Sequence, residues 1–262
     1  MKIGLVLEGG GMRGLYTNGV LDCMMDNDWY PDYVIGVSAG ACSAVSYISG
    51  QRGRSYRINT GYLGDKRYVG LDSFIKTKSM FGMDFIFDEI PNRLDPFDYK
   101  AFLASPIEMV TGVTDIETGM PVYFDKSAVS PGDSTLWRAS SSIPGFSPVV
   151  SFRGGRYLDG GTSDPIPVRR ALADGCGRLV IVLTDNLKRC IELALTDICC
   201  PAEYDRACVL YLIQEKFAKI LHIHPAFLSV HHGHRTVQLH RLLCCHALYR
   251  LCHIRQLAHA GR

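Results

Sequence analysis

Two short apolar runs near the start of the chain each end in a glycine-containing turn, and a segment of helical character follows each turn. Residues 2–7 stop at glycines, and apolar side chains then recur at helical spacing over residues 16–26. Residues 33–37 form the second run, and the small-residue stretch 39–46 after it suits a helix packed closely on a sheet. Two such units in succession predict parallel strands joined by helical crossovers, which constrains the fold more than any other feature.

The rest of the first 186 residues continues the alternation of strands and helices. A helix is expected at residues 167–173, and strands are expected at 107–113, 121–124, 149–152, 156–158 and 179–183. This order predicts a three-layer α/β/α sandwich with a mostly parallel central sheet. Ligands of such sheets bind where strands end and helices begin, and both glycine turns lie there.

The first turn reads Gly9-Gly10-Gly11-Met12-Arg13-Gly14. Consecutive glycines allow several backbone N–H groups to converge on one point, and the helix that follows adds positive partial charge, so the loop is suited to an oxygen anion. The spacing also matches the G-x-G-x-x-G pattern of dinucleotide-binding proteins, which requires an acidic residue at the end of the second strand. Asp32 precedes that strand. On this turn alone, an oxyanion loop, a dinucleotide site and a structural turn all stay open.

The second turn reads Gly36-Val37-Ser38-Ala39-Gly40, a G-x-S-x-G sequence between a predicted strand and a predicted helix. This is the context of a nucleophile elbow, in which the flanking glycines permit a sharp turn that lifts the serine hydroxyl out of the sheet. The dipole of the following helix and the Ala39 N–H favour developing negative charge beside Ser38. We interpret Ser38 as a nucleophile, with a purely structural turn as the alternative.

A serine nucleophile requires a base, and the sequence has no histidine before His222. A carboxylate is the more economical base, and Asp159 in Asp159-Gly160-Gly161 follows the predicted hairpin, where two glycines let the backbone approach the site. An unshifted aspartate is a weak base, so this interpretation demands partial desolvation and a short hydrogen bond to Ser38. Taken by itself, Asp-Gly-Gly is an ordinary turn sequence.

Together, and in this order, the three motifs resemble those of the patatin-like phospholipase family over about residues 1–184. The Ser- and Pro-containing stretch at residues 140–148 also resembles the segment that precedes the Asp-Gly hairpin in that family. The resemblance implies a three-layer α/β/α fold and a serine–aspartate dyad that hydrolyses acyl esters of lipids without a metal or an organic cofactor. It assigns Ser38 as the nucleophile, Asp159 as the base and the loop from Gly9 to Gly14 as the oxyanion hole.

Three other features have both a functional and a structural interpretation. Arg13 either braces the glycine loop or meets a substrate phosphate, and bracing is favoured because the arginine fork commonly ties backbone carbonyls together. The basic stretch at residues 52–67 is interpreted as a solvated face rather than a head-group patch. The apolar cluster at residues 80–87 is either a lid, an acyl pocket or part of the core, and core packing is the safer assumption.

The overall composition is that of an ordinary globular protein. The 262 residues have a net charge of +2, with 47% hydrophobic and 21% charged residues, which excludes a disordered chain and disfavours nucleic acid as a partner. No window is apolar for long enough to span a membrane or to form a signal-peptide core, so we expect a cytoplasmic protein with peripheral membrane contact. Cys23, Cys42 and Cys176, the three cysteines before residue 187, are expected to be buried thiols.

The composition changes near residue 186, which divides the chain into a catalytic region, 1–186, and a Cys/His-rich basic segment, 187–262. The segment holds seven of the ten cysteines, all nine histidines and no acidic residue after Glu215. Its cysteines and histidines lack the spacing of structural zinc sites, so no metal site is expected. Leucines between Leu239 and Ile254 trace one helical face beside arginines, which suits a basic helix lying on anionic lipid. An out-of-frame or damaged gene end would produce the same change, so we expect the segment to be helical or aberrant.

These observations predict a serine lipid acyl hydrolase, a phospholipase A-type enzyme or esterase, whose substrate is a lipid or another acyl ester. One alternative is a catalytically inactive α/β scaffold that contacts membranes or proteins. Another is a nucleotide-binding oxidoreductase, which the serine at the second turn disfavours. The sequence does not predict the head group, the acyl chain, hydrolysis as against acyl transfer, or the oligomeric state.

Overall fold

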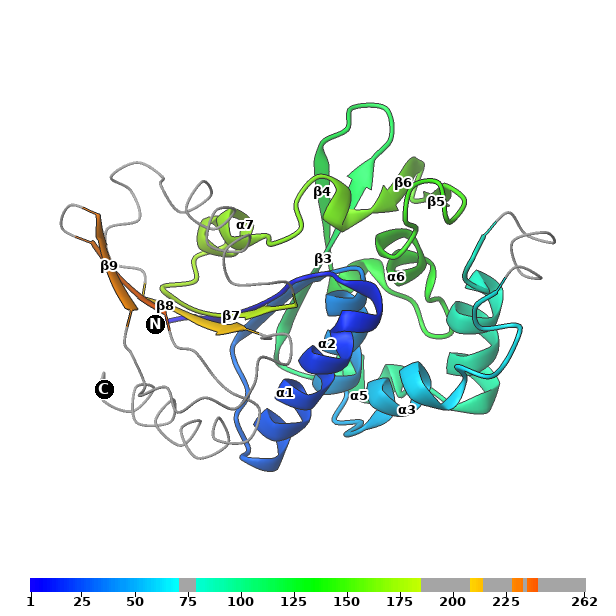
Figure 1. Cartoon of the computed structure of the whole chain (residues 1–262), viewed down its shortest axis with the longest axis horizontal. Coiled ribbons are helices and arrows are strands. Elements are labelled where there is room, and N and C mark those ends of the chain that lie inside the picture. Colours follow the sequence, from blue (N-terminus) through cyan, green and yellow to red (C-terminus); the bar gives the residue numbers. More distant parts are fainter. Residues whose placement is uncertain (71–78, 185–207, 214–227, 233–234, 240–262) are drawn as a thin grey trace, which may run out of the picture.

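The computed structural model describes residues 1–70, 79–184, 208–213, 228–232 and 235–239, and within them a single mixed sheet runs through the protein (Figure 1). The order of the strands across the sheet is β5-β6-β3-β2-β1-β7-β8-β10-β9, with β4 paired to β3. The strands are β1 (Ile3–Leu7), β2 (Tyr33–Val37), β3 (Glu108–Asp115), β4 (Pro121–Asp125), β5 (Val150–Phe152), β6 (Gly155–Asp159), β7 (Arg178–Leu183), β8 (Cys208–Ile213), β9 (Leu228–His232) and β10 (Arg235–Leu239).

The centre of the sheet is parallel, as the sequence predicts. Strands β3, β2, β1, β7 and β8 all pair in parallel, because the early strands are joined by helices that return the chain to the same edge. Antiparallel strands are added at both ends, where short turns connect β3 to β4, β5 to β6 and β9 to β10. The predicted hairpin around Gly154-Gly155 is the β5–β6 pair, and its strand β6 also pairs antiparallel with β3.

Helices cover both faces of this sheet. Helices α1 (Gly14–Asp26), α2 (Ala39–Ile48), α3 (Arg54–Gly61) and α5 (Tyr99–Ala104) lie on one side, and α7 (Val168–Ala173) lies on the other (Figure 1). Helix α6 (Thr135–Ser140) packs on β3, β5 and β6, and a π-helix, η2 (Phe85–Leu94), packs against α6. The predicted three-layer α/β/α arrangement is confirmed. Single 3₁₀ turns follow β1, β4 and β6: η1 (Gly11–Arg13), η3 (Lys126–Ala128) and η4 (Gly160–Thr162).

The main hydrophobic core lies between the sheet and the helices of the α2 side. Strands β1, β2 and β7 are almost wholly buried, which agrees with their near-continuous apolar sequences. Helix α2 lies directly on β2 and contacts α1, α3, α5 and α6, so its small residues allow a close approach on every side. Helix α2, which follows Ser38, is therefore enclosed by neighbouring elements along most of its length.

Strands β8, β9 and β10 come from the Cys/His-rich segment, and they continue the same sheet beyond β7. The basic helix expected between Leu239 and Ile254 lies outside the described residues except for Leu239, which ends β10. Cys23 and Cys176 are buried free thiols, as expected. Cys42 differs, because it is only half-buried and lines a cavity.

Candidate active site

Ser38 stands at the sharp turn between β2 and α2. Its backbone has φ 52° and ψ −127°, a strained conformation for a residue with a side chain, and it forms the N-terminal cap position of α2. The turn depends on its glycines: a Cβ on Gly40 would lie 2.5 Å from the Leu7 carbonyl oxygen, and one on Gly36 would lie 2.8 Å from the Ala41 nitrogen. The geometry is that of the predicted elbow, with Ala39 opening the helix.

Asp159 ends β6 and lies beside Ser38. The Gly161 N–H donates to Asp159 Oδ1 at 2.8 Å, and the Ser38 side chain is near enough to the carboxylate to affect its pKa. Burial raises the pKa of Asp159, and the nearby Ser38 side chain and Gly161 N–H oppose that rise only in part. The side chain is 6% exposed. The carboxylate is therefore desolvated, which the interpretation of Asp159 as a base requires. Gly160 lets β6 pass against β3, because a Cβ there would lie 2.3 Å from the Gly112 carbonyl oxygen.

The C-terminal end of α6 fixes both of these residues, which the sequence did not predict. The backbone N–H of Ser38 donates to Ser140 Oγ at 2.9 Å, and Ser140 Oγ donates in turn to the Gly112 carbonyl oxygen at 2.7 Å. Two residues further on, the Ser142 carbonyl oxygen accepts from the backbone N–H of Asp159 at 2.8 Å. The only sequence signal for this support is the serine run at residues 140–142.

The glycine loop lies against the same serine. A Cβ on Gly9 would be 3.2 Å from the Ser38 Cβ, so the loop passes directly over the elbow. Gly10 and Gly11 have φ values of 155° and 53°, of which the second lies in the left-handed region that favours glycine. The N-termini of two helices meet here, since a Cβ on Gly14 at the start of α1 would lie 3.0 Å from the Ala39 Cβ at the start of α2. Their dipoles place positive partial charge beside Ser38.

A second hydroxyl group outside the motifs holds this loop. Thr184, which follows β7, donates from Oγ1 to the Gly9 carbonyl oxygen at 2.5 Å, and its backbone N–H donates to Glu8 Oε2 at 2.5 Å. Arg13 turns back along the loop, because its Nε lies 3.4 Å from the position that a Cβ on Gly10 would occupy. Met12 is 39% exposed and lies at the cavity beside Ser38.

The position of Asp32 argues against the alternative that the glycine loop binds a dinucleotide. Asp32 lies before β2, where its Oδ2 accepts from the Ile3 N–H at 2.7 Å, at the opposite end of the strands from the glycine loop. The end of β2 holds Ser38 instead of an acid. The residue that would bind a ribose is therefore absent from the position where that site requires it.

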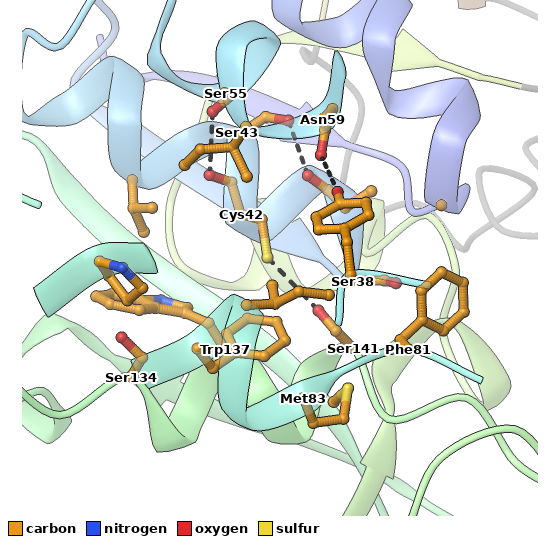
Figure 2. A pocket seen from close by; sticks show the side chains of 18 of the residues that line it. Ser38, Cys42, Ser43, Ser55, Asn59, Phe81, Met83, Ser134, Trp137 and Ser141 are labelled. Atoms are coloured by element: carbon orange, nitrogen blue, oxygen red, sulfur yellow. Dashed lines mark hydrogen bonds between the residues drawn. The ribbon is translucent and has the colours of Figure 1, made fainter. Parts of the chain in front are cut away.

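A cavity of about 150 Å³ opens beside Ser38 between α2, α3, η2 and α6 (Figure 2). Its walls are mostly apolar, and part of the cluster at residues 80–87 belongs to them, so that cluster forms the cavity wall as well as core. Cys42 lies one helical turn from Ser38, and its Sγ is 3.5 Å from Ser141 Oγ. Burial raises the pKa of the Cys42 thiol to about 11, so it stays protonated at neutral pH. The apolar lining residues include Val45, Ile58, Phe81, Met83, Ile86, Phe87, Pro91, Phe97, Trp137 and Ile143.

The basic stretch after α2 is held by neighbouring acids. Arg52 pairs with Asp26, and Arg67 pairs with Asp65 and Glu89; the two arginines are more than half exposed to solvent. These ion pairs agree with the solvated-face interpretation. Arg54 does not fit it, because this side chain is buried at the cavity.

Fold and site together define an α/β protein with a serine at a sharp strand-to-helix turn, a buried carboxylate beside it and a glycine loop against it. The sequence matches the family model for patatin-like phospholipases over residues 5–172, so the chain belongs to the patatin-like phospholipase family. The sequence-based expectation of that family and fold is confirmed.

Two curated relatives illustrate the range of the family. The uncharacterized protein YjjU of Escherichia coli is 31% identical over 196 residues, which are 70% of this chain and 52% of YjjU. The lysophospholipase NTE1 of Candida albicans is 27% identical over 191 residues, which are 69% of this chain and 13% of NTE1. The match therefore spans about half of the first relative and a small part of the second.

Among solved structures, VipD from Legionella pneumophila matches with a TM-score of 0.45 and 11% identity, covering 81% of this chain and 50% of VipD. This overall similarity is too low to support an inference. The fold assignment depends on the family match and on the strands and helices described above.

The described part of the chain contains no cluster of three or more His, Cys, Asp or Glu side chains suited to a metal ion. Within the same residues, none of the helices has the length and apolar character needed to cross a bilayer.

Proposed function

We propose that the protein is a serine lipid acyl hydrolase in which Ser38 is the nucleophile and Asp159 is the general base. The observation that carries the proposal is the placement of a buried carboxylate with a raised pKa, Asp159, beside Ser38, which stands at a strained strand-to-helix turn. The family and its lysophospholipase relatives support hydrolysis of lipid esters as the chemistry. The dyad, the oxyanion loop and the substrate of this chain are the finer parts of the proposal.

In the proposed reaction, Ser38 Oγ attacks the ester carbonyl carbon while its proton passes to the Asp159 carboxylate. The N–H groups of Gly10 and Gly11 and the N-terminus of α2 stabilise the negative charge that develops on the carbonyl oxygen. When the tetrahedral intermediate collapses, the alcohol leaves and takes the proton from Asp159. Water then attacks the acyl-enzyme carbonyl while Asp159 accepts its proton, and the bond to Ser38 breaks as Asp159 returns that proton to Ser38 Oγ and the fatty acid is released.

Burial suits Asp159 to this role. A carboxylate with its ordinary pKa holds a proton weakly, and the raised pKa of Asp159 makes it a stronger base toward the serine hydroxyl. The apolar surroundings also strengthen its interaction with the positive end of α2, because fewer solvent dipoles screen it. The base thus does not need a histidine.

The cavity supports an acyl group as the part of the substrate that is recognised. Its apolar walls begin at Ser38 and include aromatic and thioether side chains that match a hydrocarbon chain. We place the ester carbonyl at the elbow and the acyl chain in the cavity, with the alcohol part of the lipid directed to solvent or to a membrane surface.

The proposal is tested by labelling and hydrolysis. The wild-type protein should react with a fluorophosphonate probe and hydrolyse a lysophospholipid, Ser38→Ala should do neither, and Asp159→Asn should lower the rate by about 10²–10⁴-fold because it removes the proton acceptor. Asp164→Asn is the matched control, since Asp164 lies five residues further on and accepts a hydrogen bond from the Tyr123 hydroxyl.

Full activity of Asp159→Asn would contradict the dyad. Absence of probe labelling in the folded wild-type protein would favour the inactive scaffold.

A further inference from the structure

One charged side chain lines the cavity among the described residues: Arg54, at the start of α3. It is 5% exposed, and its guanidinium lies over the Phe97 ring at 5.3 Å from the ring centroid. An arginine stays protonated in proteins, so this end of a mostly apolar cavity carries a positive charge. A cavity made only for a hydrocarbon chain has no use for such a group, because burying a charge is costly unless it is paired.

The pairing of Arg54 is incomplete. Its nearest acid is Asp95, but both carboxylate oxygens of Asp95 accept hydrogen bonds from Arg57, at 3.1 and 3.3 Å. Arg54 Nε is 3.4 Å from Asp95 Oδ1, an ion-pair distance, but it makes no hydrogen bond. The remaining contacts of Arg54 are neutral: one terminal nitrogen donates to the Asp95 carbonyl oxygen at 2.7 Å, and the other lies 3.5 Å from Ser46 Oγ. Two guanidinium groups thus share one carboxylate.

Helix α2 sets the distance between this charge and the nucleophile. Ser38, Cys42 and Val45 line the cavity along successive turns of α2, and Arg54 contacts Ser46 one residue further on. The eight residues from Ser38 to Ser46 correspond to about 12 Å of helix. Arg54 therefore lies at the far end of the cavity from the ester-cleaving serine, where the end of a bound acyl chain of medium length would lie.

We propose that the cavity accepts acyl chains that end in a carboxylate, and that Arg54 is the residue that selects them. The proposal rests on the proposed hydrolase function and adds the substrate class to it. A terminal carboxylate supplies the acceptor that Arg54 Nε lacks and a negative charge that Arg54 does not have to share with Arg57, through charge-assisted hydrogen bonds at a water-poor site. A chain that ends in a methyl group would leave the guanidinium buried and only partly paired.

The test compares 4-nitrophenyl esters of matched length. Monoesters of adipic, suberic and sebacic acid are compared with the hexanoate, octanoate and decanoate, and kcat/KM is measured for the full chain. At one of the three lengths, the wild-type protein should prefer the carboxylate-ended ester. If the protein hydrolyses only the methyl-ended esters, or hydrolyses them faster at every length, the proposal about the chain end is overturned and the hydrolase function stands. If it hydrolyses no ester and Ser38 is not labelled by the fluorophosphonate, both are overturned.

Two arginine variants locate the selection. Arg54→Gln should lower the preference for the carboxylate-ended ester by about tenfold or more, the effect of losing a charge-assisted hydrogen bond. Arg57→Gln is the control, because Arg57 is on the same helix and binds the same Asp95 but its side chain is 57% exposed and does not line the cavity. Fluorophosphonate labelling of Ser38 verifies that each variant is folded. The assignment to Arg54 would be overturned if labelled Arg54→Gln kept the wild-type preference for carboxylate-ended esters, or if both variants lost that preference equally. If Arg54→Gln does not fold, the comparison of the ester pairs with the wild-type protein decides.

Discussion

At the scale of single residues, Asp159 combines a functional group with a cost in stability. Burial raises the pKa of its carboxyl group, so the folded state holds this proton to a higher pH than the unfolded chain does. The free energy of unfolding therefore falls as the pH rises from the Asp159 pKa in the unfolded chain through its pKa in the folded protein. At neutral pH the folded protein contains a buried carboxylate charge, and an uncharged group of the same shape would cost less to bury.

Asp159→Asn should accordingly be less active but more stable at neutral pH. The asparagine has nearly the same shape, still offers an oxygen to the Ser38 hydroxyl and does not ionise. Urea unfolding should give a larger free energy of unfolding for the variant than for wild type at pH 7, with the difference shrinking toward pH 4 as Asp159 becomes protonated. A variant that is less stable at pH 7, or a difference that is the same at both pH values, would contradict the raised pKa.

The sequence singles out Ser38 and Asp159 as candidates because their neighbours are constrained by short-range geometry. The glycines around them are needed where the backbone turns sharply or approaches another strand, and such needs leave a visible pattern in the sequence. Ser140 and Thr184 leave no such pattern. Each acts through one hydroxyl group on a backbone atom more than a hundred residues away, and any exposed or buried serine or threonine looks the same in a sequence.

At the scale of elements, the end of α6 and the residues after it connect the proposed nucleophile Ser38 to the proposed base Asp159. Ser140 accepts from the Ser38 N–H, and the Ser142 carbonyl oxygen accepts from the Asp159 N–H, so one short helix connects the elbow after β2 to the end of β6. Strands β2 and β6 do not pair with each other, because β3 lies between them in the sheet. A helix outside the sheet therefore provides the connection.

Ser140→Ala should lower kcat while leaving KM nearly unchanged. The change leaves the buried Ser38 N–H and Gly112 carbonyl without their partner, which costs about 1–3 kcal/mol of stability and loosens the elbow. Ser142→Ala is the matched control, since this serine is equally buried but its hydroxyl donates to the Arg138 carbonyl oxygen of the preceding α6 and not to the Ser38 turn. Steady-state kinetics and thermal unfolding of both variants measure the difference, and an equal effect on kcat in the two would count against the role of Ser140.

The elements themselves were largely predictable, because periodicity and turn residues are local. The predicted hairpin, the buried strand β7 and the helices after the two glycine turns all appear with small shifts at their ends. The π-helix η2 was not predicted, since it contains Pro91 and its apolar residues face both the core and the cavity. The apolar cluster at residues 80–87 overlaps the start of η2. It forms a cavity wall only because α2 and α6, which are distant in sequence, form the other walls.

At the scale of the whole molecule, the change in composition near residue 186 does not coincide with an edge of the sheet. Strand β8 pairs with β7 over six residues, from Arg178 with Cys208 to Leu183 with Ile213, and β10 pairs with β8 on its other side. Strand β7 is thereby an inner strand, which agrees with its burial on both faces. Because Thr184 follows β7 and binds the glycine loop, the position of that loop depends on strands from residues 208–239.

A proline in β8 tests this continuity. Leu210 pairs with both Val180 and Gln238, so Leu210→Pro removes a ladder hydrogen bond inside the sheet and should lower the free energy of unfolding by about 1–3 kcal/mol. Ser229→Pro, in the outer strand β9, should cost less because the described residues pair that strand on one side only. The loosened end of β7 should also slow fluorophosphonate labelling of Ser38, through Thr184 and the Gly9 carbonyl. If Leu210→Pro matches the wild-type protein in both thermal unfolding and labelling rate, β8 does not support β7 in solution, and residues 1–186 would then form their catalytic sheet without the Cys/His-rich segment.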